Sequence, residues 1–362
     1  MAERALATIR IVDEILPIEG KDRIEVAVFG GWEVIVKKGE FWPGGWAIFF
    51  EIDSFIPTSV APFLTRPNKV PKEYNGTQGE RLRTVRMGGQ LSQGLCLPVY
   101  QGSLAGIGEG YYVQDPNEPT SPAFVFRLEE GNDVTDLFGI QLWEPPQNVF
   151  MGGGHAVEAF PYGIPKTSQP RAQNIKSQIA RAYENGESYE TTEKMDGSSM
   201  QVVVAYNDDN TINRLVFSRN CIISDEESVF HKVAVSSGIW DKIASTGRQL
   251  SIQGELVGPN IQGNRYALKE PVFLVYAIWD IEQRQFLLPG ERHDLCSALQ
   301  LDHVPVISIG QFVDSPQAAL EFAERKSAAN DKRIAEGVCY AHLTKRGVSF
   351  KAVSNSYLEE IG

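Results

Sequence analysis

Short strands separated by turns fill the sequence from Thr8 to about Tyr100. Apolar and polar residues alternate in part along 23–37, and Gly30-Gly31 interrupts the alternation near its middle, which predicts a β-hairpin. Further strands are predicted over 46–51 and 91–98. Because several short strands precede any convincing helix, this part of the chain is expected to close into a small β-barrel of the OB type, a common nucleic-acid-binding architecture.

The next segment, 101–155, is rich in Gly, Pro, Asn and Asp, and 152–154 is a run of glycines. Such a composition is typical of a connection between domains. We therefore expect an OB-type domain with its linker in 1–154 and a second domain in 155–362.

Helical and strand patterns are mixed in the second domain, so its expected fold class is α+β. Helical spacing predicts helices over 171–183, 226–244 and 316–329, with Asp225 and Ser315 as N-caps. Apolar runs predict strands over 202–206, 215–218, 273–278, 304–309, 338–343 and 348–353.

Composition excludes several classes of protein. With 362 residues, 42% hydrophobic and 22% charged, the chain can form two domains with separate cores. A net charge of −12 argues against a protein that coats nucleic acid through bulk positive charge, but leaves room for a local basic patch. Such a patch could be formed by Lys37, Lys38, Arg81, Arg83 and Arg86, although solvated strand faces explain these five residues equally well.

The cysteines and histidines show no metal-binding spacing. The 4 cysteines are scattered without a CxxC pair, which predicts reduced thiols in a cytoplasmic protein. The 5 histidines are interpreted as surface residues or as satisfied core residues. No apolar run is long enough to span a bilayer, and the amino terminus lacks the apolar core of a signal peptide.

The most informative segment is Glu193-Lys-Met-Asp-Gly-Ser-Ser199, which lies between two predicted strands. A lysine at a strand edge, followed by Asp196 and Gly197, can present its amine to a pocket while glycine permits a tight turn. Alone, K-x-D-G is a weak signal, and a surface lysine before a β-turn explains it more often. The segments that follow change this balance: Ser218-Arg-Asn220, Gln253-Gly-Glu-Leu-Val-Gly-Pro259, Glu336-Gly-Val338 and Ser349-Phe-Lys351.

In this order the segments resemble the covalent nucleotidyltransferase superfamily, which comprises lysine-adenylate ligases and guanylate-forming capping enzymes. The resemblance covers nearly all of 160–362. It implies that Lys194 attacks the α-phosphate of ATP to form lysyl-AMP. A protonated amine is a poor nucleophile, so nearby positive charge from Lys351 and a bound metal is expected to lower the pKa of Lys194.

The resemblance also implies roles for the surrounding residues. Glu336 is expected to hold Mg²⁺ or Mn²⁺, while Lys351 and Arg219 neutralise the departing pyrophosphate. Glu255 is expected to accept hydrogen bonds from the ribose, and Phe273, Tyr276 or both to stack on the base. Each of these residues has an ordinary structural alternative, since Glu255 and Glu336 could be strand-end charges and Tyr276 a core residue. The other nucleotide-binding residues carried over are Arg171, Gln173, Asn174 and Glu193.

Within the superfamily, the chain looks like the RNA ligases typified by the Deinococcus and Naegleria enzymes, in which an OB domain precedes the adenylyltransferase domain. DNA ligases and capping enzymes usually carry an OB domain after the last motif, whereas little sequence follows Lys351 here. One departure is Ser349, because many ligases have a lysine there. Local similarity to the RNA ligases extends over 32–40, 50–57, 91–95, 164–174 and 254–262.

The resemblance therefore implies an ATP-dependent RNA ligase that joins 5′-phosphate and 3′-hydroxyl ends, with nicked duplexes as substrates and RNA repair as its role. We expect a monomer that binds nucleic acid and no membrane. Two alternatives remain open at this point. One is a DNA ligase or a GTP-dependent capping-type enzyme, and the other is a non-catalytic OB-containing protein that binds nucleic acid.

Overall fold

The computed structural model describes residues 4–104, 108–114, 122–144, 155–156, 159–207, 209 and 211–361. The chain divides into two compact units, one formed by Met1–Gln147 with Glu359–Gly362 and the other by Asn148–Leu358. Gly154, where the sequence analysis places the domain boundary, lies outside the described residues.

The first unit contains the predicted barrel strands and confirms the OB-type architecture. Gly30 and Gly31, with φ of 60° and 97°, form the two-residue turn of a hairpin in which Phe29 pairs with Trp32. Positive φ at both turn positions matches the twist of the flanking strands and costs glycine little. The strands of this barrel region are β1 (Ala7–Ile11), β2 (Glu14–Pro17), β3 (Ile24–Phe29), β4 (Trp32–Lys37), β5 (Trp46–Phe50), β10 (Gln90–Ser92) and β11 (Leu95–Pro98).

The predicted linker is partly wrong, because much of 101–144 forms strands. β12 (Tyr100–Leu104), β13 (Gly108–Gln114) and β14 (Pro122–Phe126) make a three-stranded sheet, and Phe124 packs on buried Phe138. Glycine and proline within these strands concealed them from composition alone. The remaining elements of this unit are η1 (Pro62–Leu64), β6 (Ser54–Pro57), β7 (Lys72–Tyr74), β8 (Thr77–Arg81), β9 (Val85–Met87) and β15 (Gln141–Leu142).

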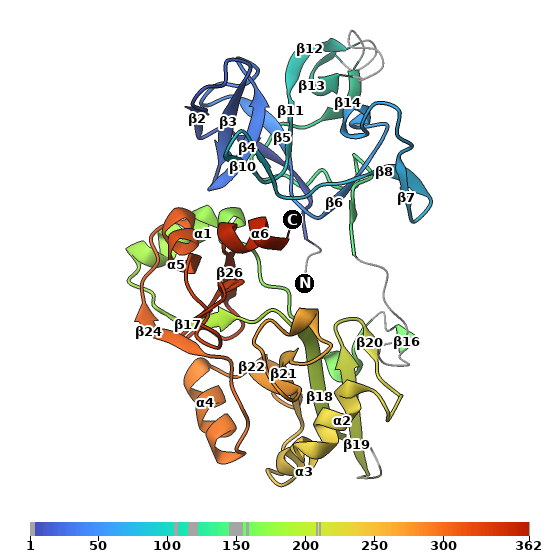
Figure 1. Cartoon of the computed structure of the whole chain (residues 1–362), viewed down its shortest axis with the longest axis vertical. Coiled ribbons are helices and arrows are strands. Elements are labelled where there is room, and N and C mark those ends of the chain that lie inside the picture. Colours follow the sequence, from blue (N-terminus) through green and yellow to red (C-terminus); the bar gives the residue numbers. More distant parts are fainter. Residues whose placement is uncertain are drawn as a thin grey trace. The chain divides into compact units, whose positions relative to one another are not determined.

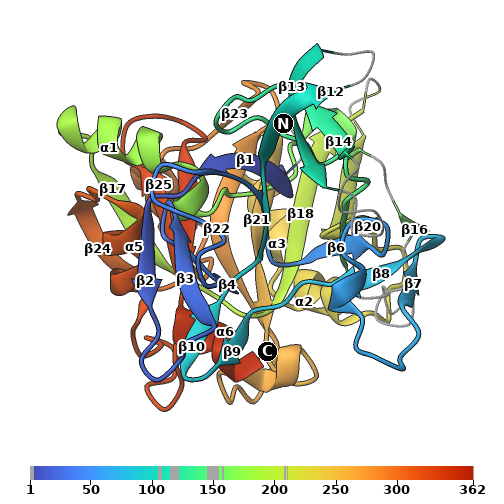
Figure 2. The same ribbon diagram turned by 90° about the horizontal axis from the view of Figure 1, so that it is seen from above.

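Two antiparallel sheets form the second unit. The larger sheet has the order β16-β20-β19-β18-β21-β22-β23 and the smaller has the order β24-β17-β25-β26. The central strands β18, β21 and β22 lie side by side (Figures 1 and 2). The larger sheet comprises β16 (His155–Ala156), β18 (Ser198–Tyr206), β19 (Ile212–Ser218), β20 (Cys221–Ile222), β21 (Leu250–Val257), β22 (Val272–Asp280) and β23 (Gln285–Phe286). The smaller comprises β17 (Tyr189–Lys194), β24 (Val306–Gln311), β25 (Gly337–His342) and β26 (Ser349–Val353).

Helices cover both sheets. Apolar side chains of α2 and α3 pack on one face of the larger sheet, whereas α1 and α5 contribute to the core on the smaller sheet. The α+β prediction is therefore confirmed. The helices are α1 (Lys176–Glu184), α2 (Val229–Ser236), α3 (Ile239–Ala244), α4 (Pro289–Ala298), α5 (Pro316–Ala323) and α6 (Asn355–Ile361), with 3-10 turns η3 (Pro161–Gly163), η4 (Ala172–Asn174) and η5 (Gln262–Asn264).

Several predicted helix boundaries shift. The predicted helix 226–244 is two helices that break before Ile239, and its first N-cap is Ser228, whose hydroxyl accepts from the His231 amide, instead of Asp225. The Asp225 carboxylate bonds to the Glu227 amide outside the helix. Ser315 is confirmed as the N-cap of α5, with a 3.2 Å bond from Ala318 N.

None of the helices built from the described residues has the length and apolarity needed to cross a bilayer.

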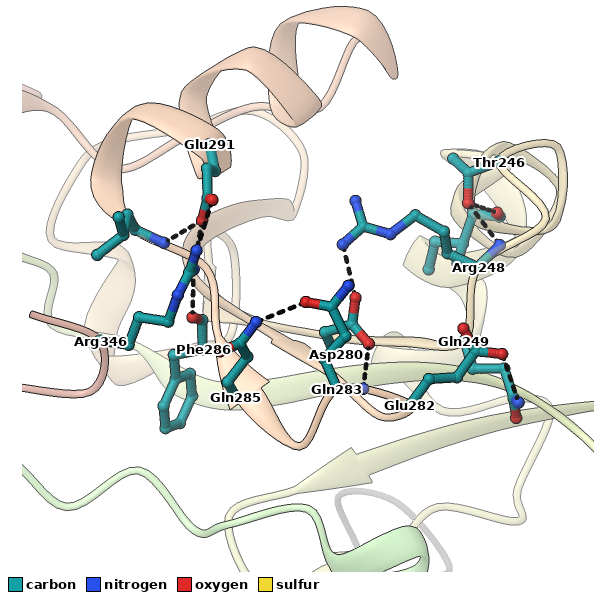
Figure 3. A network of polar contacts seen from close by, with 12 residues as sticks. Thr246, Arg248, Gln249, Asp280, Glu282, Gln283, Gln285, Phe286, Glu291 and Arg346 are labelled. Atoms are coloured by element: carbon teal, nitrogen blue, oxygen red, sulfur yellow. Dashed lines mark hydrogen bonds and ion pairs between the residues drawn. The ribbon is translucent and has the colours of Figure 1, made fainter. Parts of the chain in front are cut away.

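A polar network joins the larger sheet to the loop between β25 and β26 (Figure 3). Arg346 of that loop donates to Glu291 of α4 at 2.6 Å and to the Phe286 carbonyl at 3.0 Å. Arg248 forms a 2.6 Å ion pair with Asp280 at the end of β22. The network therefore fastens the two sheets together through α4 and the β23 edge.

The Glu291 ion pair predicts a pH effect on stability. The hydrogen bond from Arg346 lowers the pKa of Glu291 to about 2, from about 4.3 in an unfolded chain. Stability from this pair is therefore present above about pH 4.3 and lost as pH falls toward 2. Because the Glu291 side chain is 44% exposed, solvent screening limits the contribution to about 1 kcal/mol or less.

The measurement compares urea unfolding of the wild type and Glu291→Gln from pH 7 to pH 2. The wild type should be the more stable at pH 7, and the difference should disappear in acid. A difference that does not change with pH would contradict the assignment.

Candidate active site

Lys194 is the last residue of β17 and pairs with Gly337 of β25. The following turn brings the chain from the smaller sheet into β18 of the larger sheet. Gly197 is needed in this turn, because a Cβ there would lie 2.4 Å from the Leu256 carbonyl oxygen and 2.9 Å from Glu255 Cγ. The K-x-D-G segment is therefore a close crossing between the two sheets, with Lys194 at its start.

The Lys194 amine is partly buried and forms an ion pair with Glu336, the residue before β25. Burial alone would lower the pKa of Lys194, but the negative charges of Glu336 and Glu255 outweigh burial and raise this pKa above its ordinary value. The amine is therefore protonated at neutral pH when no nucleotide is bound. Its use as a nucleophile requires the charges around it to change.

The two carboxylates that face Lys194 are themselves perturbed. Burial raises the pKa of Glu255 to about 8, with Glu336 and Asp196 adding to the rise and Lys194 opposing it. Burial also raises the pKa of Glu336, again against the effect of Lys194. Carboxylates that are buried together repel one another, so a divalent cation would be stabilised among them. Their oxygen donors suit the magnesium or manganese that the sequence predicts.

Strand register places Lys351 on the same face of the smaller sheet as Lys194. Lys351 pairs directly with Cys339, and Cys339 pairs with Thr192, two residues before Lys194. Directly paired residues, and residues two apart along a strand, share a face. Ser349 pairs with Ala341, farther along the same strands, so the position that is lysine in many ligases carries no charge here.

Tyr276, and not Phe273, lies on the Glu255 face of the larger sheet. The pairings Ser199 with Glu255 and Glu255 with Leu274 put Tyr276, two residues beyond Leu274, on the Glu255 face. Its hydroxyl lies 3.2 Å from Thr167 Oγ1 and 3.4 Å from Ser199 Oγ. Phe273 is 7% exposed and belongs to the core on the helix-covered face. The predicted stacking on the base therefore stays a prediction for Tyr276, whereas Phe273 lies in the core away from Glu255.

The segment before the lysine also reaches this site. Arg171 forms a parallel bridge with Lys351, and the Lys351 amide donates to the Pro170 carbonyl at 2.9 Å. Gln173 and Asn174 follow in η4, and the buried Gln173 side-chain oxygen has no hydrogen-bond partner among the described residues. Such an orphaned buried acceptor is compatible with a ligand donor.

Glu193 and Arg219 occupy different positions relative to the amine. The Glu193 carboxylate accepts from Ser327 Oγ at 2.5 Å and from the Ala328 amide at 2.7 Å, on the opposite face of β17 from Lys194. Its side chain therefore anchors the loop at 327–330, which sequence reasoning did not anticipate. Arg219 follows β19 and is exposed. Its positive charge acts to lower the pKa of Glu255, but burial raises that pKa by more.

Two further residues at this site carry no role in the sequence analysis. Asp196 adds a third negative charge near Glu255 and Glu336. Its place in K-x-D-G was the signal that could have identified it. Cys339 lies between the charged groups and donates to Gln169 Oε1 at 3.0 Å, and burial raises the pKa of its thiol to about 11.

A histidine cluster beside the smaller sheet is hydrogen-bonded to the guanidinium of Arg292. Glu190, His293 and His303 bring potential metal-ligand atoms within 4.8 Å of one another. Arg292 bonds to Glu190 and donates to His303 Nε2 at 2.8 Å, while His303 Nδ1 lies 2.6 Å from the Val304 carbonyl. Glu190 and both histidines therefore have hydrogen-bond partners in the structure.

A separate hollow of about 490 Å³ lies beside the start of α2, between α2 and the segment 259–271. Its lining includes the acidic residues Asp225, Glu227 and Glu270 and one lysine, Lys269. This charge disfavours a triphosphate. The site around Lys194 is therefore the better candidate for nucleotide chemistry.

Comparison with known proteins agrees with this geometry. A family model described as an OB-fold domain matches 6–99, and the RNA ligase model matches 187–353. A solved structure of a Naegleria gruberi RNA ligase variant with AMP and manganese is 35% identical, covers 99% of each chain and superposes with a TM-score of 0.81. The chain belongs to the RNA ligase family.

Other solved structures of the Naegleria gruberi RNA ligase are similar to this RNA ligase over the same length. One variant with ATP and manganese is 35% identical with a TM-score of 0.80 and covers 98% of each chain. The structure with pyrophosphate is 34% identical with a TM-score of 0.80 and covers 99% of each chain. No curated protein sequence matches the chain.

Proposed function

We propose that this RNA ligase uses ATP and a divalent metal to seal 5′-phosphate and 3′-hydroxyl ends in nicked duplexes through a lysyl-AMP intermediate. The observation that carries the proposal is the position of Lys194 at a strand end, paired with Glu336 and sharing a sheet face with Lys351. A protein that only binds nucleic acid does not require a partly buried amine surrounded by carboxylates.

The first step follows from the charges around Lys194. Entry of the triphosphate would add negative charge beside Lys351 and Arg171, and Glu336 would release the amine to hold a metal ion. Loss of the ion pair with Glu336, together with the positive charge of Lys351, would lower the pKa of Lys194, so that its ammonium group loses its proton to solvent. The neutral nitrogen then attacks the α-phosphorus, and the bond from that phosphorus to the pyrophosphate oxygen breaks. A bound Mg²⁺ or Mn²⁺ would supply positive charge at the phosphates.

The other residues bind and orient the nucleotide. Tyr276 would stack on the base, Glu255 would accept from the ribose, and Arg219 would neutralise charge on the leaving group. Arg171, Gln173 and Asn174 would line the same pocket. The AMP group then passes to a nucleic-acid 5′-phosphate, and attack by the 3′-hydroxyl releases AMP and forms the phosphodiester bond.

The proposal extends to the substrate and setting of the enzyme. The enzyme is expected to act as a monomer and to work in the cytoplasm, where cysteines without a CxxC pair are expected to stay reduced thiols. In the first unit, Lys37 and Lys38 are exposed and available to phosphates. Arg81 is less available, because it pairs with Asp53 at 2.6 Å and stacks on Trp143.

The test first compares ATP with GTP as nucleotide donors and then compares nicked duplexes with RNA or DNA at the 3′-hydroxyl end. The protein is incubated with α-labelled ATP or GTP and Mn²⁺, and label is followed on the denatured protein. ATP alone should label it. Duplexes with a single nick should then be sealed faster when the 3′-hydroxyl end is RNA than when it is DNA. Labelling by GTP would favour the capping-type alternative, and equal sealing of DNA ends would contradict the RNA preference.

A further inference from the structure

Two buried tyrosines hold Asp196, the residue two positions after Lys194. The Asp196 amide donates to the Tyr266 hydroxyl at 2.6 Å, and the Tyr357 hydroxyl donates to the Asp196 carboxylate. Each tyrosine is 5% exposed. The backbone and the side chain of Asp196 are thus fixed from two different segments of the chain, η5 with its following loop and the carboxy-terminal helix α6.

The start of helix α6 is hydrogen-bonded to the backbone of Glu336. The Ser354 amide, just before α6, donates to the Glu336 carbonyl at 2.9 Å. Ser354 Oγ accepts from the Tyr357 amide at 3.0 Å and donates to Glu324 at 3.1 Å. The start of α6 therefore connects the backbone of Glu336 to Tyr357, and through the Tyr357 hydroxyl to Asp196.

The Tyr266 loop is fastened to the same elements. Arg265 donates to the Ile334 carbonyl at 2.8 Å, two residues before Glu336, and its guanidinium lies 4.8 Å from the centre of the Tyr357 ring. Asn330 donates to the Arg265 carbonyl at 2.9 Å. The two tyrosines thus belong to one connected arrangement that surrounds the Asp196 and Glu336 positions.

A tyrosine beside Asp196 differs chemically from a positively charged residue in the same place. Asp196 and Glu336 repel each other in a buried site, so their separation must be imposed by other groups. A neutral hydroxyl can stabilise an ionised carboxylate without adding a fixed positive charge. A lysine or arginine in the same place would compete with an incoming cation for that carboxylate.

We propose that Tyr266 and Tyr357 are positioning residues that fix Asp196 relative to Glu336, so that the carboxylates beside Lys194 are held ready for the divalent metal that accompanies ATP. This inference rests on the proposed function. Through Tyr357, helix α6 supports the nucleotide-transfer site, although it follows the last recognisable motif.

The first test measures the Mn²⁺ dependence of lysyl-AMP formation for Tyr357→Phe and Tyr266→Phe. Loss of a partner that orients a metal-binding carboxylate typically costs about 10–100-fold in metal affinity or activity. The Mn²⁺ concentration for half-maximal labelling should rise by a factor in that range. Tyr183→Phe is the matched control, because Tyr183 on α1 is 50% exposed and should leave the dependence unchanged.

The second test does not depend on turnover. Mn²⁺-dependent ATP binding is measured by calorimetry for Lys194→Ala and for Lys194→Ala combined with Tyr357→Phe. Binding should weaken in the double variant. In a separate cycle with Asp196→Asn, the Tyr357→Phe change should add little to the labelling defect, because it acts through the same carboxylate.

The outcomes separate this inference from the proposed function. If the wild type forms no lysyl-AMP, the proposed function fails. If the wild type is labelled and Tyr357→Phe keeps the wild-type Mn²⁺ dependence and ATP binding, the positioning role is overturned. A lower melting temperature with unchanged Mn²⁺ dependence, or an effect fully additive with Asp196→Asn, would also overturn it by showing a structural role alone.

Discussion

Lys194→Ala is expected to abolish lysyl-AMP formation, lowering the rate at which label from ATP becomes attached to the protein by about 10⁴-fold or more. The variant lacks the amine that attacks the α-phosphorus, while the carboxylates and Lys351 remain. Label on the denatured protein is followed over time with α-labelled ATP and Mn²⁺. Because no covalent intermediate forms, sealing of a nick that starts from ATP and an unmodified 5′-phosphate should be lost as well.

Lys194→Arg is the matched control for charge. Arginine keeps a positive partner for Glu336, but its guanidinium remains protonated and cannot serve as the nucleophile. It should therefore fold as well as the wild type and remain unlabelled. Label that persists in both variants would show that another residue forms the bond to AMP. Label lost only in the alanine variant would mean that Lys194 acts through its charge.

The sequence was sufficient to predict most strands of the site because their apolar runs are clear, whereas β17, which carries Lys194, is largely polar and was indicated by the K-x-D-G motif at its end. Lys194 and Lys351 share a face of the smaller sheet by strand register, and Glu336 directly precedes a paired strand. The turn from β17 into β18 brings Glu255 of the larger sheet beside them, because Ser199 of β18 pairs with Glu255. The OB-type barrel was predictable for the same reason, with Gly30-Gly31 marking its hairpin.

The direction of individual side chains was harder to predict. The register between β21 and β22 shifts between Gln253 and Gly254, so simple alternation could not decide whether Phe273 or Tyr276 shares the Glu255 face. Glu193 is adjacent to the nucleophile in sequence, yet it faces the other side of β17 and binds the loop at 327–330. A position next to the nucleophile therefore does not fix the direction of this carboxylate, and the nucleotide-binding role carried over for Glu193 stays a prediction.

The short elements that support the site were also missed. Helix α4 has apolar residues too scattered to show helical spacing, and α6 is only seven residues long. Their contributions depend on tertiary contacts: α4 supplies Arg292 and α6 supplies Tyr357. Such contacts join residues far apart in sequence, and a pattern confined to a short window does not contain them.

Arg292→Ala is expected to reduce the free energy of unfolding by about 3–5 kcal/mol, because it leaves the buried Glu190 carboxylate without its guanidinium partner. The two side chains are 5% and 1% exposed, so water cannot readily replace the lost contact. Urea denaturation of the wild type and the variant, monitored by tryptophan fluorescence, measures the loss. Glu190 lies on β17 four residues before Lys194, so adenylylation should also slow in the variant.

A double variant distinguishes an unpaired charge from a simple cavity. Combining Glu190→Gln with Arg292→Met removes both charges while keeping similar volumes, and replacement of a whole buried ion pair is often close to neutral. The double variant should therefore be more stable than Arg292→Ala, and also more stable than Arg292→Met alone. If the double variant is no more stable than Arg292→Met, the loss comes from packing or from the bond to His303, and the buried charge of Glu190 is not its cause.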